Sequence, residues 1–291
     1  MIPPSFDYEA PTSVSAAVAL LGNNPDAKVL AGGQSLIPMM RFRLASPAVL
    51  VDINRIADLA YIREDSGWLK IGAMTREAEL DASDLVREKY PLLADTTRMV
   101  ADPVVRNLST LGGNLAHADP ANDHPATMLA YGAEVVAMGK AGERTIPIGK
   151  FFTGPFQTAL KQSELITEIR IPASDARSGG AYIKLERKVG DFATAAVAAQ
   201  LTLDKSGKVS YAGVALTNVG PTPIKAPAAE QALVGNKPED PVIRRAAALA
   251  AEAAQPESDA RGSAEYKRAL VKTLTVRALR KAVQRAQGGM S

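Results

Sequence analysis

The hydrophobic positions in the N-terminal part of the chain alternate between helical and strand-like spacing. Apolar residues recur at helical intervals from Pro11 to Leu21, which predicts a helix. The runs KVLA at residues 28–31 and AVLVD at residues 48–52 predict two short strands. A hairpin is predicted next, because the turn sequence DSG at residues 65–67 separates two further strand patterns.

The middle of the chain combines short helices with single strands. Helical patterns begin at Thr75, which can cap its helix, and at Tyr90. Another short helix is predicted over residues 127–132. It precedes a strand at residues 133–138 and a turn at residues 139–144.

The stretch LITEIRI at residues 165–171 alternates apolar and polar side chains, so it predicts a strand with one solvated face. Residues 172–180 are rich in Pro, Ser, Gly and charge, and they mark the best domain boundary. Beyond them, strand patterns at residues 181–187, 193–203 and 209–216 are joined by tight turns. They predict an antiparallel meander.

Two alanine-rich helices are predicted after the meander, over residues 241–254 and 263–285. The second has a basic face, which we expect to be solvated. This face carries Lys267, Arg268, Lys272, Arg280 and Lys281.

Composition narrows the class of protein. The chain has 291 residues, 46% of them hydrophobic and 22% charged, as in ordinary soluble domains. A net charge of +3 is too small to indicate a nucleic-acid partner. No apolar run approaches the roughly 18 residues of a membrane span, and the N-terminus does not resemble a secretory signal, so we expect a cytoplasmic protein. The lack of cysteine excludes disulfides, thiolate metal sites and iron–sulfur clusters held by this chain.

A glycine loop directly follows the first predicted strand. Its sequence, AGGQS at residues 31–35, places two flexible residues and a hydroxyl before an apolar segment. Successive backbone N–H groups in such a loop can bind phosphate without a cation. The loop lacks a P-loop lysine, and the chain has no G-x-G-x-x-G fingerprint. Taken alone, this loop is more often a plain turn between a strand and a helix.

A second stretch, LSTLGGNLAHADPANDHPA at residues 108–126, is the densest in chemistry-bearing residues. It contains Gly112, Gly113 and both histidines of the chain. Its two prolines indicate a rigid loop that runs into a helix start. Turns and helix caps are the common uses of such residues, so this stretch alone does not establish a ligand site.

The two loops and a third motif, KLERKVGDFATAAVA at residues 184–198, occur in an order that resembles a known family. The chain is similar to the medium, flavin-binding subunits of carbon monoxide dehydrogenase and its relatives in the xanthine oxidase family of molybdenum hydroxylases. The similarity covers essentially the whole chain. It includes the opening IPPSFDYEAP and the closing SDARGSAEYKR.

This resemblance implies an α+β fold and a non-covalently bound FAD. Two N-terminal α/β subdomains, residues 1–57 and 58–175, would have the FAD-binding fold of the vanillyl-alcohol oxidase group. A C-terminal domain, residues 176–291, with an antiparallel sheet and helices, would cover the flavin. FAD then supplies the redox chemistry, and no side chain or metal of this chain needs to act as a catalyst.

The resemblance also assigns site residues. The two glycine loops would contact the pyrophosphate from opposite sides, and Asp123 would contact the ribityl and adjoining polar atoms. Lys184 matches a lysine that approaches the flavin ring, whereas Phe192 replaces a tyrosine beside that ring and lacks its hydroxyl. The candidate FAD-binding residues are Ala31, Gly32, Gly33, Gln34, Ser35, Thr110, Leu111, Gly112, Gly113, Asn114, His117, Asp123, Lys184 and Phe192.

Partners follow from the same resemblance. Electrons would reach the flavin one at a time from a [2Fe-2S] subunit and leave as a pair to an external acceptor. Because this chain has no cysteine, the clusters would lie on a separate small subunit. The molybdenum cofactor would lie on a large one, in a dimer of heterotrimers.

Three alternatives remain open from the residues. One is an assembly subunit that has lost its flavin. Another is a metal-dependent hydrolase with His117, Asp119, Asp123 and His124 as ligands, although sequence neighbours such as Asp123 and His124 point apart in regular structure. The third is a covalent flavoprotein linked through His117. His124 is also plausible as an ordinary polar loop residue.

Overall fold

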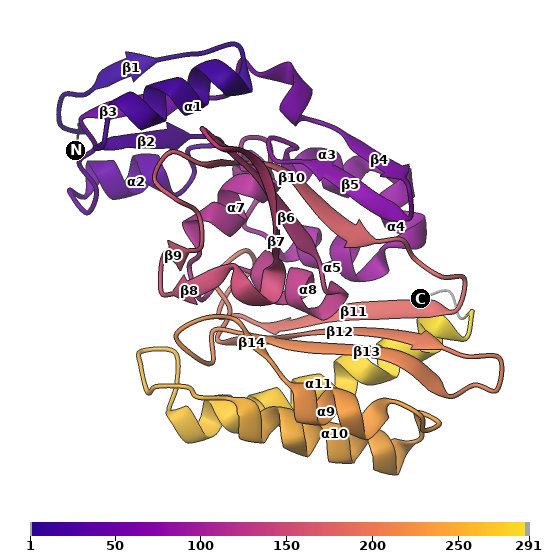
Figure 1. The fold of residues 1–291 in the computed structure, drawn as a ribbon. Coiled ribbons are helices and arrows are strands. Elements are labelled where there is room, and N and C mark those ends of the chain that lie inside the picture. Colours follow the sequence, from indigo (N-terminus) through magenta and orange to yellow (C-terminus); the bar gives the residue numbers. More distant parts are fainter. Residues whose placement is uncertain (1, 289–291) are drawn as a thin grey trace.

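Three main β-sheets follow one another along the chain in the computed structural model, which describes residues 2–288 (Figure 1). The first is a parallel sheet of order β1-β3-β2, covered by two helices. We refer to these elements as the first unit: β1 (Asp7–Glu9), α1 (Val14–Asn23), β2 (Ala27–Leu30), α2 (Leu36–Arg41) and β3 (Val49–Asp52).

The second unit contains an antiparallel sheet of order β4-β5-β10-β6-β7 and six helices. A 3-10 turn, η1 (Ala57–Leu59), leads into it. Its strands are β4 (Ile62–Asp65), β5 (Trp68–Gly72), β6 (Glu134–Gly139), β7 (Gly142–Pro147), β8 (Phe152–Gly154), β9 (Gln157–Thr158) and β10 (Leu165–Pro172). Its helices are α3 (Glu77–Ala82), α4 (Asp84–Lys89), α5 (Pro91–Met99), α6 (Pro103–Arg106), α7 (Leu111–His117), α8 (His124–Tyr131) and the 3-10 turn η2 (Ile148–Lys150).

The third unit is a four-stranded antiparallel sheet backed by three helices, so the predicted meander and the α+β class are confirmed. The strands are β11 (Ser178–Leu185), β12 (Ala195–Leu203), β13 (Val209–Thr217) and β14 (Ile224–Lys225). The helices are α9 (Pro227–Leu233), α10 (Asp240–Ala253) and α11 (Ala264–Ala286).

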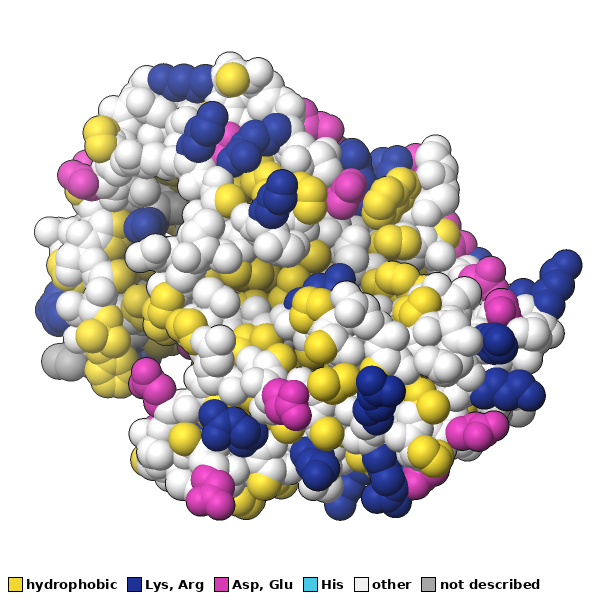
Figure 2. Space-filling model, turned by 60° about the horizontal axis from the view of Figure 1, so that its bottom comes forward, with side chains coloured by type: hydrophobic (Ala, Val, Ile, Leu, Met, Phe, Trp, Pro, Cys, Tyr) yellow, Lys and Arg dark blue, Asp and Glu magenta, His cyan; other side chains and the backbone are white. Residues whose placement is uncertain are grey.

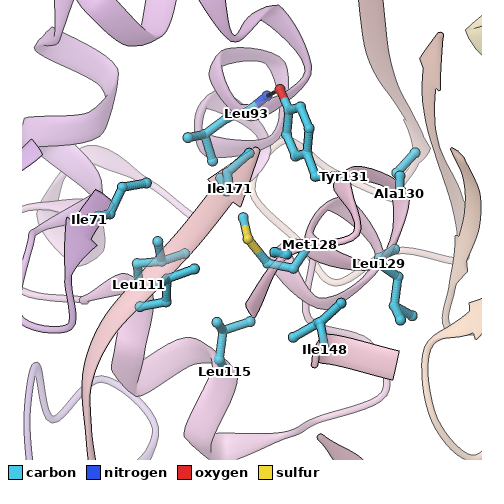
Figure 3. Close-up of a cluster of buried hydrophobic side chains, with 14 of the residues drawn as sticks. Ile71, Leu93, Leu111, Leu115, Met128, Leu129, Ala130, Tyr131, Ile148 and Ile171 are labelled. Carbon is cyan, nitrogen blue, oxygen red and sulfur yellow. Dashed lines mark hydrogen bonds between the residues drawn. The ribbon is translucent and has the colours of Figure 1, made fainter. Parts of the chain in front are cut away.

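The hydrophobic core joins the second and third units. Helices α5 and α8 lie between the second sheet and the third, while α9, α10 and α11 cover the other face of the third sheet (Figure 1). Leu111 and Leu115 of α7 belong to the same buried cluster as Met128 of α8 and Ile171 of β10 (Figure 3). The N–H of Leu93 in α5 donates to the Tyr131 hydroxyl at 3.2 Å, which satisfies a polar group inside this core.

Three local predictions are wrong and a fourth is only partly right. Residues 111–117 form helix α7 rather than part of a rigid loop. The turn predicted at residues 139–144 is confined to residues 140–141, because strand β7 already begins at residue 142. Strand β10 is the centre of its sheet and has no solvated face. Thr75 caps no helix, because its hydroxyl donates to the Tyr61 carbonyl at 2.9 Å and accepts the Tyr61 N–H at 3.1 Å. Helix α3 starts two residues later, at Glu77.

The basic face of α11 is only partly solvated. Figure 2 shows acidic and basic side chains interspersed over the side of the molecule that this view brings forward. Lys267 is buried against Asp259, and Lys281 and Arg285 both reach Asp95 of α5, at 3.2 and 2.7 Å. The last two pairs tie the third unit to the second. In residues 2–288, no helix has the length and apolar character needed to cross a membrane.

Candidate functional site

A cavity of about 1330 Å³ lies where the three units meet, and we call it the central cavity. The β2–α2 loop forms one wall and the segment from Val100 to Asp123 forms another. Residues 153–166 and the loop before β12 complete it. The candidate residues that line it are Ala31, Gly32, Gly33, Gln34, Ser35, Thr110, Gly112, Gly113, Asn114, His117, Asp123 and Phe192. Leu111 and Lys184 do not line it.

The first glycine loop, residues 31–35, presents unused backbone donors to this cavity. Within residues 2–288, no protein acceptor takes the N–H groups of Gly32, Gly33, Gln34 or Ser35. Gly33 has φ +76°, a left-handed conformation that glycine adopts without strain. Helix α2 begins directly afterwards, so its N-terminus adds a partial positive charge. The loop can therefore bind an anionic group through its main chain.

The second glycine loop, residues 110–114, is built differently. The N–H groups of Leu111 and Gly112 donate to the carbonyls of Thr75 and Ala73, at 3.1 and 2.9 Å. Gly113 donates to the Thr110 hydroxyl at 3.1 Å, and Asn114 donates to the Thr110 carbonyl at 2.9 Å. All four amides at the start of α7 are thus satisfied within the protein. Within residues 2–288, only the Thr110 N–H of this loop has no protein acceptor, so the loop offers a ligand one main-chain donor besides its side chains.

Two buried oxygen atoms of the second loop region have no partner. Ser109 Oγ and Asn114 Oδ1 are enclosed, line the central cavity and make no hydrogen bond within the described chain. Asn122 donates to the Asn114 carbonyl at 2.9 Å and also lines the cavity. Because a buried polar atom without a partner is costly, these oxygens favour a polar ligand in the cavity.

The two loops are in direct contact. A Cβ atom on Gly32 would collide with the carbonyl of Leu108 and lie 2.7 Å from Ser109 Cα. A Cβ atom on Gly112 would lie 2.6 Å from the carbonyl oxygen of Ala73. Arg76 stabilises the contact between the first and second units by donating to the Leu108 carbonyl and to the Asn54 side chain. Close packing is therefore one physical reason for glycine in both loops, between the first and second units at Gly32 and within the second unit at Gly112.

Asp123 connects the cavity to the third unit. It precedes α8 but its side chain caps no amide; instead it accepts from the Tyr182 hydroxyl at 2.7 Å and from Lys184 Nζ at 3.0 Å. Burial raises the pKa of the Asp123 carboxyl, and the neighbouring Lys184 ammonium opposes that shift. Each carboxylate oxygen keeps a further lone pair for a ligand. Asp123 can therefore hold a hydroxyl or amide group at the cavity wall.

Lys184 lies behind Asp123 and not on the cavity surface. Its ammonium contacts the Met99 carbonyl at 2.8 Å, Asp123 Oδ2 at 3.0 Å and Glu186 Oε2 at 3.2 Å. Two of its three donors are used in hydrogen bonds, to Met99 and Asp123, while Glu186 Oε2 lies within ion-pair distance. In this structure Lys184 therefore mainly orients Asp123.

His117 ends helix α7 and faces the central cavity beside Phe156. The two ring centroids are 5.3 Å apart. Burial lowers the pKa of His117, and Asp119, whose Oδ2 is 3.9 Å from Nε2, acts in the opposite direction. At neutral pH the imidazole is therefore uncharged. It can stack or exchange hydrogen bonds with a polar ligand.

His124 belongs to a separate buried contact. Its Nε2 atom is 2.7 Å from Glu77 Oε2, and both side chains are completely buried between α3 and α8. Asp119 accepts the N–H of Ala121 at 2.9 Å and so shapes a turn. The four side chains proposed as metal ligands thus have different partners. Within residues 2–288, no group of three or more His, Cys, Asp or Glu side chains is arranged to hold a metal ion.

Phe192 also lines the cavity and is 48% exposed. It belongs to the loop between β11 and β12, which the third unit extends toward the second. Leu111, in contrast, is fully buried in the core (Figure 3).

Two residues at or beside the cavity were not identified from the sequence. Tyr182 lies within a plain strand pattern, and its hydroxyl meets Asp123 from β11, which packs against α5. Phe156 also lines the cavity, and it has φ +56° and is 54% exposed. That unusual backbone is a signal only the structure provides.

These features fit a bound dinucleotide. The four unused amides suit a pyrophosphate, which needs many N–H donors at short range. The unpartnered oxygens of Ser109 and Asn114, with Asp123, suit hydroxyl and amide donors of a ligand. The glycine loops contain no lysine or arginine, so main-chain dipoles would carry the anion recognition.

Known proteins share this architecture. Residues 4–174 match the FAD binding domain in molybdopterin dehydrogenase, and residues 180–282 match the CO dehydrogenase flavoprotein C-terminal domain. The carbon monoxide dehydrogenase medium chain of Hydrogenophaga pseudoflava is 47% identical, over 96% of this chain and 97% of that one. The corresponding chain of Afipia carboxidovorans is 44% identical, over 99% and 100%.

A solved structure agrees with these sequences. Carbon monoxide dehydrogenase from Hydrogenophaga pseudoflava, in a form that lacks the Mo-pyranopterin moiety of its cofactor, contains a chain that superimposes with a TM-score of 0.95. The match covers 98% of this chain and 99% of that one at 48% identity.

Proposed function

Because the chain belongs to the family of FAD-binding medium subunits of molybdenum hydroxylases, we propose that it holds FAD non-covalently in the central cavity and relays electrons through it. The protein is thus a flavoprotein subunit of an oxidoreductase. The observation that carries the placement is the run of four unused amides at Gly32–Ser35, which faces the cavity. Bound FAD would supply the redox chemistry, accepting electrons singly and releasing them in pairs.

The chain's own residues would bind and orient the cofactor. The first glycine loop would donate its amides to the pyrophosphate, and Ser109 and Asn114 would offer side-chain oxygens beside it. Asp123 would accept hydrogen bonds from a polar part of the flavin. Lys184 and Tyr182 would keep the Asp123 carboxylate oriented, since both donate to it. Phe192 would form an apolar wall that excludes water from part of the cavity.

We further propose that residues 1–57 and 58–175 act as the two FAD-binding subdomains and that residues 176–291 close the site. The direct contact between the glycine loops supports a joint FAD site made by residues 1–57 and 58–175. The hydrogen bonds from Tyr182 and Lys184 to Asp123 support the closing role of residues 176–291, because they join the third unit to the cavity wall.

The iron–sulfur clusters and the molybdenum site would be carried by other chains. The lack of cysteine supports a separate small [2Fe-2S] subunit, and the relatives' designation as medium chains supports a larger and a smaller partner. We propose a dimer of heterotrimers in which the large subunit selects the substrate. The isolated chain should therefore not reduce a dye at the expense of carbon monoxide, an aldehyde or an N-heterocycle.

The decisive experiment is visible absorbance of the purified chain before and after acid precipitation. A flavin spectrum that moves to the supernatant supports the proposal. Flavin retained on the pellet indicates a covalent link, for which His117 is the candidate, and a His117→Ala variant would then release it. A colourless chain that cannot be reconstituted with FAD contradicts the proposal and favours a structural subunit.

A further inference from the structure

The loop between β11 and β12 forms part of the cavity wall, but it lies outside the hydrogen-bonded ladder of the third sheet. Its base is closed by a hydrogen bond from the Thr194 N–H to the Leu185 carbonyl, at 2.7 Å. Farther out, Val189 is 94% exposed and Phe192 is 48% exposed. A loop with so little apolar burial needs another anchor to keep one conformation.

Arg261 provides that anchor from the segment between α10 and α11. Its two terminal nitrogens each donate to the Asp191 carboxylate at 3.1 Å, and Nη1 also donates to the Phe192 carbonyl at 2.9 Å. Asp191 in turn accepts the Phe192 N–H at 2.8 Å. The backbone of Phe192 is thus held at both its donor and its acceptor. The Arg261 guanidinium also holds the pKa of Asp191 well below its usual range.

Arg261 is itself fixed to the helical layer. Its N–H donates to Asp259 Oδ1 at 2.8 Å, within a tight turn in which Asp259 and Gly262 exchange backbone hydrogen bonds. Asp259 Oδ2 pairs with Lys267 of α11 at 2.7 Å. The Lys267 side chain is only 4% exposed and also donates to the Glu257 carbonyl. A continuous chain of contacts therefore runs from α11 to the cavity wall.

We propose that Arg261 is a positioning residue that sets the place of Phe192 in the cavity wall and so slows the escape of bound FAD. This inference rests on the proposed function, because it needs FAD in the central cavity. Arg261 would act on the cofactor only through the Asp191–Phe192 segment. Charge-assisted, two-pronged bonds of this kind are stronger and more directional than neutral ones. Their loss should let Phe192 move away from the ligand.

A double-mutant cycle tests that route. The variants are Arg261→Met, Phe192→Ala and the pair together, each as the full chain reconstituted with FAD. The readouts are the FAD dissociation rate and the visible circular dichroism of the bound flavin. Arg261→Met should speed dissociation about tenfold, as expected from losing one charge-assisted contact. The double variant should match Phe192→Ala, because the two residues act in series.

Arg187 supplies the matched control. It also donates to Asp191, at 3.2 Å, but its side chain is 58% exposed and it does not touch Phe192. Arg187→Met should change dissociation less than about twofold, as for other exposed ion pairs. Arg261→Lys should fall between the wild type and Arg261→Met, since lysine keeps the charge but not the fork.

Three results would overturn the inference. They are additive effects in the cycle, an Arg187→Met effect as large as that of Arg261→Met, or unchanged dissociation in Arg261→Met. If Arg261→Met does not fold, Asp191→Asn replaces it in the same cycle, because it removes the same charge-assisted contact. A wild-type chain that never retains FAD would overturn the proposed function as well, which separates the two failures.

Discussion

The two glycine loops look alike in sequence and differ in structure. AGGQS leaves four successive amides without a protein acceptor, whereas in TLGGN the amides of Leu111 to Asn114 all donate, to carbonyls and to the Thr110 hydroxyl. In the first loop, a left-handed glycine turns the main chain so that its amides can serve a ligand. In the second, glycine lets a helix start press against Ala73. A Gly-Gly pair therefore indicates either open donors or close packing, and only the acceptors around it decide which.

The largest expected effect tests packing in the second loop. Gly112→Val should destabilise the apoprotein by about 3 kcal/mol or more, because the new side chain would overlap Ala73. Urea unfolding of the apoprotein measures this. Gly149→Val is the matched control, since a Cβ there meets nothing within 4 Å. An apoprotein of normal stability that cannot bind FAD would instead make Gly112 a ligand contact.

The next effect tests the open donors of the first loop. Ser35→Pro removes one unused N–H at the start of α2, where no internal hydrogen bond is lost. FAD affinity should fall roughly 10- to 100-fold, as for one hydrogen bond to a charged group. The apoprotein should lose some stability, because Ser35 has φ −106° and proline requires about −65°. Equilibrium titration with FAD measures it, and Ser35→Ala keeps the amide as a control. Equal affinities for the two variants would rule out the amide as a donor.

A smaller effect is expected for the side chains beside the second loop. Ser109→Ala and Asn114→Ala remove buried oxygens that have no protein partner. Each should weaken FAD binding about fivefold, the equivalent of one ordinary hydrogen bond. The apoprotein should melt at an unchanged or higher temperature, because no internal bond is lost. A lower melting temperature with normal FAD affinity would show that these oxygens serve the fold.

The smallest effect concerns pH and the far end of α7. Burial lowers the pKa of His117 in the folded protein, whereas in the unfolded chain the pKa is the ordinary value of about 6.5. At pH values between the two, the unfolded chain therefore binds more protons than the folded one. Stability should therefore rise with pH through this window and be lost on acidification. Melting curves of the apoprotein between about pH 5 and 7 should show a weaker dependence in His117→Gln. An identical pH dependence in both proteins would argue against a buried, neutral His117.

Local sequence patterns were sufficient to predict those helices and strands whose hydrogen-bond partners are close in sequence. The β4–β5 hairpin and the β11–β13 meander follow from alternation and tight turns, and both are present. Helix α1 also follows from its spacing, and Ser13 caps it by accepting the Ala16 N–H. In each case the hydrogen bonds that define the element connect residues a few positions apart or across one turn.

Distant partners explain what the patterns missed. Helix α7 contains two glycines, and its first amides find acceptors at Thr75 and Ala73, more than thirty residues earlier. Thr75 was predicted as a cap, but Tyr61 takes its hydroxyl. Lys184 likewise donates to Met99 and Asp123, which precede it by 85 and 61 residues. No spacing rule in the sequence encodes these long-range choices.

The ion pairs of Asp95 can form only late in synthesis of the chain. Asp95 lies in α5, but its partners Lys281 and Arg285 follow it by 186 and 190 residues. At translation rates of about 5–20 residues per second, roughly 10–40 s pass before those partners exist. Arg261 likewise reaches Asp191 only 70 residues later. The nascent chain therefore carries both glycine loops well before the residues that attach its third unit to α5 have been made.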